Sequence, residues 1–236
     1  MNYLSKMFFL FVIAIPYIMS AQIRILLTAA LTDAHYEFRK DEYIHAFNTL
    51  KNLGYEEFYI VEALKKGGHT FLDEYSSHVL YATANDPLCK NQGVNESRTM
   101  LEALDYFDFD PEDMIIKLTG RHRLISDFII KMVENNPDCD VFFKYCKGMY
   151  PAFFDGMVPT MCFAMRCKFL REMYATIDYK KMQQENMPIE WLVPAFINRM
   201  VNEGKMKSMI LDKLDIRVNA FASSASPGLA EKIVIF

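Results

Sequence analysis

The sequence lacks the residue pairs that usually bind metals or form disulfide frameworks. Its five cysteines are an odd number with no Cys-x-x-Cys pair, and its five histidines are dispersed and form no His-x-x-x-His pair. Most of the cysteines lie in apolar stretches such as CDVFFKYC (139–146) and MCFAMRC (161–167), where buried free thiols are the usual arrangement. We therefore expect neither a disulfide framework nor a zinc site.

The sequence also lacks a concentration of positive charge. Its 26 Lys and Arg and 30 Asp and Glu residues give a net charge of −4, and the cations are scattered, not gathered into the basic stripe of a nucleic-acid binder. There is no internal repeat and no low-complexity linker; ASSASPG (222–228) indicates a surface loop. The chain has 236 residues, 52% of them hydrophobic, which is enough for one large packed domain. The scattered cations make nucleic acid an unexpected partner.

The amino-terminal segment has the features of a secretory signal. Lys6 precedes an uncharged apolar stretch at 7–19, and the small residues Ser20 and Ala21 follow. The stretch is shorter than the roughly 20 residues that span a bilayer as a helix. We expect a cleaved signal at 1–21 and a domain at 22–236, which places the protein in the secretory pathway. The alternatives are an uncleaved anchor that associates with a membrane through residues 7–19, or an upstream extension of a cytoplasmic protein whose translation begins at Met19.

Apolar runs alternate with amphipathic segments along the rest of the chain. Each run is short and bounded by turn residues, and most amphipathic segments have apolar residues at helical spacing. This alternation predicts βαβ units, and hence an α/β fold: a single Rossmann-like domain with a mostly parallel sheet flanked by helices. The expected strands are 23–31, 57–63, 78–84, 113–118 and 139–146, and the expected helices are 33–54, 94–107, 126–135 and 188–204. Residues 157–174 indicate a strand that runs into a helix, and 208–211 and 232–236 are short β-like pieces.

Ligands of open parallel sheets bind at the carboxyl ends of the strands, near a topological switch point. In this sequence those ends are Thr28, Glu62, the loop 85–93 and the segment 117–121. Because these segments share one edge of the predicted sheet, we expect them to meet there.

The stretch KNQGVNE (90–96) ends a loop and opens a helix. Backbone N–H groups at a helix start attract anions, and Gly93 would let a ligand approach the backbone closely. Glu96 lies in the first turn, where it complements the helix dipole. An ordinary loop and helix cap is the alternative reading of this stretch.

The stretch IIKLTGR (115–121) places two cations at a strand end. Arg121 offers a planar fork for phosphate and Lys117 a mobile point charge, while Thr119 adds a hydroxyl and Gly120 an unobstructed turn. A solvated surface arginine is the alternative for Arg121. A charge within an apolar strand is costly to bury without a partner, so Lys117 is expected to be functional or ion-paired.

Together, these blocks resemble a group of bacterial and viral glycosyltransferases with the A-type nucleotide-sugar fold, whose shared blocks are N-K-G-x-x-E and K-x-T/S-G-R-Y. The resemblance covers about residues 23 to 200 and extends to an R-x-x-x-Y block in YEFRKDEY (36–43) and to IVE (60–62). It implies a hexosyltransferase-type enzyme that moves a sugar from a nucleotide diphosphate to a hydroxyl acceptor, such as a glycan. The donor-binding residues it implies are Thr28, Arg39, Tyr43, Glu62, Lys90, Asn91, Gly93, Glu96, Lys117, Thr119, Gly120 and Arg121.

The sequence departs from the family pattern at two positions. Gln92 stands where the lysine of N-K-G is expected, and Lys90, two positions upstream, is the candidate to replace it. His122 stands where the tyrosine of the second block is expected, which alters what could stack near the donor.

Many A-type glycosyltransferases hold a divalent metal with an Asp-x-Asp pair at the end of the fourth strand. Here Thr119, Gly120 and Arg121 take that place, and the pair Asp108 and Asp110 precedes the strand, at the opposite edge of the sheet. We therefore expect metal-independent transfer with no cofactor required, in which Lys117 and Arg121 neutralise the leaving diphosphate.

An inverting transferase needs a general base for the acceptor hydroxyl. The resemblance places such a carboxylate at a helix start beyond the fifth strand, where Glu190 lies beside Trp191, which could stack on an acceptor sugar; Asp155 is the second candidate. A dipole-complementing Glu190 and a core Trp191 are the structural alternatives. Two other functions also remain open: a catalytically inactive nucleotide-binding module, and an exported interaction domain.

Overall fold

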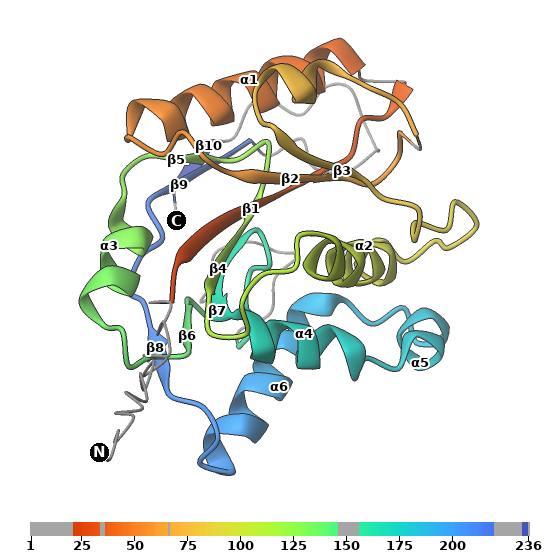
Figure 1. The fold of residues 1–236 in the computed structure, drawn as a ribbon. Coiled ribbons are helices and arrows are strands. Elements are labelled where there is room, and N and C mark those ends of the chain that lie inside the picture. Colours follow the sequence, from red (N-terminus) through yellow and green to blue (C-terminus); the bar gives the residue numbers. More distant parts are fainter. Residues whose placement is uncertain (1–20, 34–35, 66, 146–155, 220–232, 236) are drawn as a thin grey trace, which may run out of the picture.

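The computed structural model describes residues 21–33, 36–65, 67–145, 156–219 and 233–235. A seven-stranded sheet with the order β3-β2-β1-β4-β7-β6-β8 runs through the centre, and a three-stranded sheet with the order β10-β9-β5 lies beside it (Figure 1). The strands of the large sheet are β1 (Ile23–Ala29), β2 (Tyr59–Glu62), β3 (His78–Tyr81), β4 (Met114–Thr119), β6 (Val141–Phe143), β7 (Cys162–Arg166) and β8 (Ser208–Ile210). Those of the small sheet are β5 (Arg123–Leu124), β9 (Ile216–Asn219) and β10 (Ile233–Ile235).

The large sheet is mostly parallel. β1 pairs in parallel with β2 and β4, β2 with β3, and β6 with β8, whereas β7 runs antiparallel to both β4 and β6. From β1 the chain builds outward to β2 and β3, then returns to place β4 on the other side of β1. This reversal is the switch point at which open α/β sheets bind ligands. The predicted Rossmann-like α/β fold is confirmed.

Helices cover both faces of the large sheet. In Figure 1, α1 lies above the sheet and α2, α4, α5 and α6 lie below it. The helices are α1 (Tyr36–Asn52), α2 (Gln92–Tyr106), α3 (Phe128–Asn135), α4 (Cys167–Ala175), α5 (Tyr179–Gln184) and α6 (Ile189–Asn202), with a short 3-10 helix, η2 (Phe71–Glu74).

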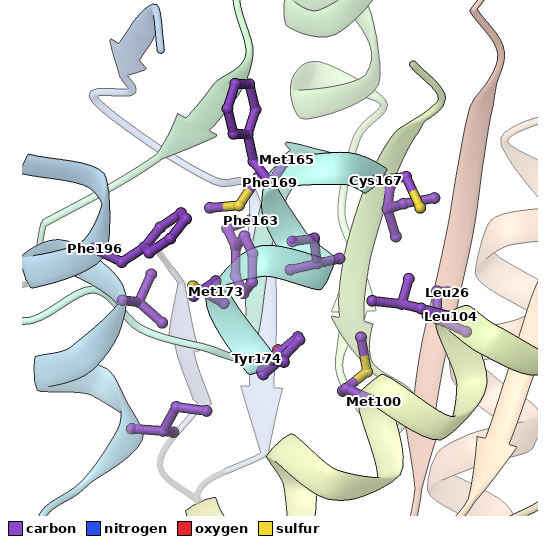
Figure 2. Close-up of a cluster of buried hydrophobic side chains, with 14 of the residues drawn as sticks. Leu26, Met100, Leu104, Phe163, Met165, Cys167, Phe169, Met173, Tyr174 and Phe196 are labelled. Atoms are coloured by element: carbon purple, nitrogen blue, oxygen red, sulfur yellow. The ribbon is translucent and has the colours of Figure 1, made fainter. Parts of the chain in front are cut away.

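Each face of the sheet has its own apolar core, because successive side chains of a strand point to opposite faces. In β4, Ile116 and Leu118 pack with α1, η2 and α3, whereas Ile115 points to the face that α2, α4, α5 and α6 cover. Figure 2 shows the second core, with Phe163 of β7 beside the side chains of α4. Lys117 follows the same alternation and points to this second face, where it is completely buried.

The structure differs from the sequence prediction in several elements. The predicted strand at 139–146 is only Val141–Phe143, and the helix predicted at 126–135 begins at Phe128. β5 and β9 were not predicted, because β5 has only two residues and its partner, β9, is distant in sequence.

The described cysteines, Cys89, Cys139, Cys162 and Cys167, are free thiols. Residues 1–20, which hold the predicted signal, and Asp155 lie outside the described residues, and no described helix is long and apolar enough to cross a bilayer.

Candidate functional site

A cavity of about 560 Å³ opens at the carboxyl ends of β1, β2 and β4. Thr28, Val61 and Thr119 are the last or next-to-last residues of these strands and form part of its wall. The loop after β3 and one side of α2 complete it. The other described wall residues are Ala29, Ala30, Thr32, Arg39, Tyr43, Ala63, Leu64, Asn85, Pro87, Cys89, Gln92, Asn95, Glu96, Thr99 and Arg121. The segments predicted to meet at one edge therefore do meet, at the switch point of the sheet.

Two guanidinium groups line the cavity. Arg39, on α1, donates from Nη1 to the carbonyl oxygen of Ala30 at 2.5 Å. Arg121 comes from the turn after β4; burial lowers its pKa, while the nearby Tyr43 and Glu42 favour its charged form. Arginine stays protonated in proteins, so this part of the wall carries two fixed positive charges with donors suited to an oxyanion.

Tyr43, a wall residue, and Gly120, the neighbour of Arg121 in the chain, hold the backbone near these arginines. The Tyr43 hydroxyl accepts a hydrogen bond from Ala30 N at 2.8 Å, and burial raises the pKa of Tyr43 to about 12, so the phenol stays neutral. Gly120 N donates to Thr28 O at 2.9 Å, which ties the turn after β4 to the end of β1. Tyr43 thus holds Ala30, whose carbonyl oxygen binds Arg39, and Gly120 holds the turn that carries Arg121.

Lys117 forms an ion pair with Glu96, a residue of the cavity wall. Lys117 Nζ lies 2.6 Å from Glu96 Oε1, donates to Thr160 O at 2.5 Å and lies 3.4 Å from Thr119 Oγ1. Lys117 is enclosed and is not among the described wall residues, whereas Glu96 is. Of the two predicted phosphate cations, then, Arg121 faces the cavity and Lys117 lies behind Glu96.

Glu62 ends β2 as predicted, but its carboxylate is directed to the backbone. It accepts hydrogen bonds from Leu31 N (3.1 Å), Leu64 N (2.8 Å) and Lys65 N (3.2 Å). Burial raises the pKa of Glu62, and these N–H groups oppose that rise by stabilising the anion. Glu62 thus fixes the loops after β1 and β2, whose residues line the cavity.

The block at 90–96 is divided between the cavity and the packing of α2. Asn91 caps α2 by accepting from Val94 N at 3.3 Å, and its amide donates to the carbonyl oxygens of Met182 and Met187. A Cβ on Gly93 would lie 2.6 Å from Met182 Cε, so this glycine permits a close approach of α5 and α6. Lys90 is exposed and not among the described wall residues.

Sequence reasoning missed several polar wall residues. Asn95 accepts from Asp86 N at 3.0 Å and donates to Asp86 O at 3.0 Å, which fixes the loop after β3. Asn95 and Thr99 share the cavity side of α2 with Gln92 and Glu96. Their helical spacing of three and four was visible in the sequence, but the stripe could equally have been a solvated helix face.

Glu190, in the first turn of α6, lies close to the ion pair. Its Oε1 accepts from Thr160 Oγ1 at 3.2 Å, and the carbonyl oxygen of the same Thr160 accepts from Lys117. Burial is the largest cause of a raised pKa of Glu190, and the negative charge of Glu96 adds to it. Trp191 is 41% exposed. Neither Glu190 nor Trp191 is among the described residues of the cavity wall.

The acidic pair before β4 lies away from the cavity. Asp108 and Asp110 are exposed and precede β4 at its amino-terminal end, and Asp110 accepts from Glu112 N at 2.8 Å in a turn. Across the described residues, no group of three His, Cys, Asp or Glu side chains is arranged to hold a metal ion.

No protein-family model and no curated protein matches this sequence. Solved structures of similar fold include 4-diphosphocytidyl-2C-methyl-D-erythritol synthase, with 10% identity over 75% of this chain and 98% of that one and a TM-score of 0.40. A glycosyltransferase involved in the glycosylation of the major capsid of PBCV-1 has 9% identity, covers 81% of this chain and 82% of its own, and gives a TM-score of 0.44. The apo-form glycosyltransferase GlyE of Streptococcus pneumoniae TIGR4 has 12% identity over 80% of this chain and 45% of its own, with a TM-score of 0.42. At these identities the likeness concerns the fold alone.

Proposed function

We propose that the protein is a glycosyltransferase that transfers a sugar from a nucleoside diphosphate to a hydroxyl acceptor. The observation that carries this proposal is the cavity at the switch point, with Arg39 and Arg121 in its wall. Its volume of about 560 Å³ is in the range of small-molecule sites. The sequence blocks that resemble A-type glycosyltransferases contribute residues to this same cavity or to its support.

Arg39 and Arg121 are the proposed ligands of the diphosphate. They approach the cavity from α1 and from the turn after β4, so that the two phosphates could bridge them. Charge-assisted hydrogen bonds from arginine to phosphate are about twice as strong as neutral ones. Positive charge placed where the leaving diphosphate develops its negative charge also stabilises the transition state. In this role the arginines take the place of a divalent ion.

Glu190 is the proposed general base, and Asp155 is the second candidate. A partly buried carboxylate with a raised pKa holds a proton more strongly than an exposed one, which suits the removal of a proton from an acceptor hydroxyl. Trp191, beside it and partly exposed, is the proposed contact for an acceptor sugar.

The test is a two-stage assay with purified protein. First, UDP-, GDP-, dTDP- and CMP-sugars are screened by thermal shift, because a ligand that binds only the folded state raises the melting temperature. Second, release of the nucleotide from each binding donor is followed with simple glycosides as acceptors, in the presence of EDTA and then of Mn²⁺.

We expect one nucleotide class to bind and to be released on transfer, with turnover retained in EDTA. Binding without turnover toward any acceptor would favour an inactive nucleotide-binding module. Strict dependence on Mn²⁺ would contradict the metal-independent step, and no binding of any nucleotide sugar would contradict the function as a whole.

A further inference from the structure

We infer that Glu96 binds hydroxyl groups of the donor's sugar, and that Lys117 is a positioning residue that holds this carboxylate in place and does not contact the diphosphate. This inference rests on the proposed function, since it assigns the two ends of a nucleotide sugar to different parts of one cavity.

Glu96 is the only residue with a carboxylate side chain among the described wall residues. A carboxylate repels phosphate, so a part of the donor other than its diphosphate is expected to lie against Glu96. An ionised carboxylate accepts hydrogen bonds and donates none. The hydroxyl groups of a hexose can donate such bonds. A wall with only neutral or positive groups would bind these hydroxyls less strongly.

The two oxygens of Glu96 are in different environments. Oε1 is buried and pairs with Lys117 Nζ at 2.6 Å. The Glu96 side chain is nevertheless 28% exposed, and Oε2, unlike Oε1, takes no part in the ion pair with Lys117. Oε2 is therefore the oxygen that remains available to a ligand, while Oε1 anchors the side chain.

The Lys117 ammonium has three polar neighbours: two accept its hydrogen bonds, and the third, Glu96 Oε1, is an ion-pair partner. Glu96 Oε1, Thr160 O and Thr119 Oγ1 lie at 2.6, 2.5 and 3.4 Å, and the side chain is completely buried. A phosphate contact would require Lys117 to give up one of these partners and to pass the wall formed by Glu96. Its geometry instead holds Glu96 in one orientation.

The charges of the cavity are separated in space. Arg39 lies on α1, which covers one face of the sheet, and Glu96 lies on α2, which covers the other (Figure 1). The uncharged polar side chains of Asn95 and Thr99 lie next to Glu96 on the same helix. A nucleotide sugar would therefore lie with its diphosphate toward α1 and Arg121 and with its sugar toward α2.

The experiment compares a nucleoside diphosphate with its sugar conjugates. Dissociation constants of UDP and GDP, and of their glucose, galactose and mannose conjugates, are measured by calorimetry on the full chain. The variants are Glu96→Gln, Lys117→Met and Lys117→Arg. The matched control is Asp105→Asn, which removes an exposed carboxylate from the same helix and breaks its ion pair with Arg171.

In Glu96→Gln we expect the nucleoside diphosphate to bind within about twofold of the wild type, and the preferred sugar conjugate to bind roughly tenfold more weakly, the effect of one lost charged hydrogen bond. The preference among the three sugars should shrink by a similar factor. Lys117→Met should show the same selective loss, Lys117→Arg should restore part of it, and Asp105→Asn should bind as the wild type does. A purely structural role would weaken diphosphate and conjugate together.

Equal weakening of the diphosphate and the conjugate in Glu96→Gln and Lys117→Met would overturn the inference, as would no change in either ligand. Both outcomes would leave the proposed function intact, because the wild type would still bind the donor. If the wild type binds neither UDP nor GDP, nor any conjugate, the proposed function fails and this inference falls with it.

Discussion

Gly120 packs directly against the ring of Tyr43. A Cβ at residue 120 would lie 3.1 Å from Tyr43 Cε1 and equally close to the carbonyl oxygen of Thr28. The turn that carries Arg121 can therefore reach the end of β1 only because residue 120 has no side chain. Tyr43, which is itself buried and hydrogen-bonded to Ala30 N, cannot easily yield.

Gly120→Ala is consequently expected to destabilise the protein by about 1–3 kcal/mol, the usual cost of an extra methyl group in a packed site. It should also weaken nucleotide binding, because the displaced turn carries Arg121. Urea denaturation measures the first effect and calorimetry the second. Gly68→Ala is the control: a Cβ there has nothing within 4 Å, so no loss of stability is expected. Equal stability of the two variants would show that the turn adapts freely.

Removal of Glu96 should destabilise the protein more than removal of Lys117. Glu96→Gln leaves an ammonium that is completely enclosed, and breaking a buried pair in this way costs about 3 kcal/mol or more. Lys117→Met leaves a carboxylate with one accessible oxygen, which water can solvate, so a cost of about 1 kcal/mol is expected. The double variant should be more stable than Glu96→Gln alone.

These stabilities are read from urea denaturation followed by circular dichroism. Asp105→Asn, which breaks an exposed pair with Arg171, is expected to change stability by less than about 1 kcal/mol. A larger loss in Lys117→Met than in Glu96→Gln, or strict additivity in the double variant, would contradict the buried-ammonium account.

His122 is expected to make folding sensitive to acid. Burial, reinforced by Arg121 and Lys117, lowers its pKa from 6.5 to about 3. Between these values the unfolded chain binds a proton that the folded chain does not, so stability is lost as pH falls below about 6.5. From pH 7.5 to 5.0 this group should cost about 2 kcal/mol.

The measurement is the difference in unfolding free energy between pH 7.5 and 5.0. His122→Gln should show a smaller acid loss than the wild type, and His45→Gln, which replaces an exposed histidine of α1, should behave as the wild type does. An unchanged acid loss in His122→Gln would mean that His122 is not held neutral in the folded state.

Glu190→Gln should abolish most of the turnover without affecting donor binding. Loss of a general base typically lowers the rate by roughly 10²- to 10⁴-fold. Because burial raises the pKa of Glu190 above 4.5, wild-type turnover should rise with pH through that raised value, and the rise should be absent from the variant. Glu185→Gln, an exposed residue at the end of α5, is the control. Near-normal turnover in Glu190→Gln together with loss in Asp155→Asn would move the base to Asp155.

The sequence predicted the edge of the sheet at which the cavity lies, and the physical reason is local. β1 and β4 are apolar runs that only a few polar residues interrupt. The carboxyl ends of parallel neighbours must share one edge, so Thr28 and Thr119 were placed together from the pattern alone. The two short strands β5 and β9 gave no such signal, since each depends on pairing with the other across a long stretch of sequence.

The directions of individual side chains were not predictable. Lys117 was expected to have a functional or an ion-paired role, and the structure shows it paired with Glu96. The sequence did not identify this partner, because strand alternation does not tell which helix will cover each face. Gly93 was expected to admit a ligand; its close contact is with Met182, a residue of α5 that no local pattern connects to it. Both roles depend on contacts between segments distant in sequence.

Calorimetry of UDP and GDP binding to Arg121→Gln measures whether Arg39 and Arg121 bind the diphosphate of a sugar donor. The matched control is Arg199→Gln, since Arg199 is an exposed arginine of α6 that pairs with Glu172. We expect that at least one diphosphate binds the wild type, that Arg121→Gln weakens this binding roughly tenfold or more, and that Arg199→Gln leaves it unchanged. Undiminished affinity in Arg121→Gln, or no diphosphate binding to the wild type, would contradict this expectation.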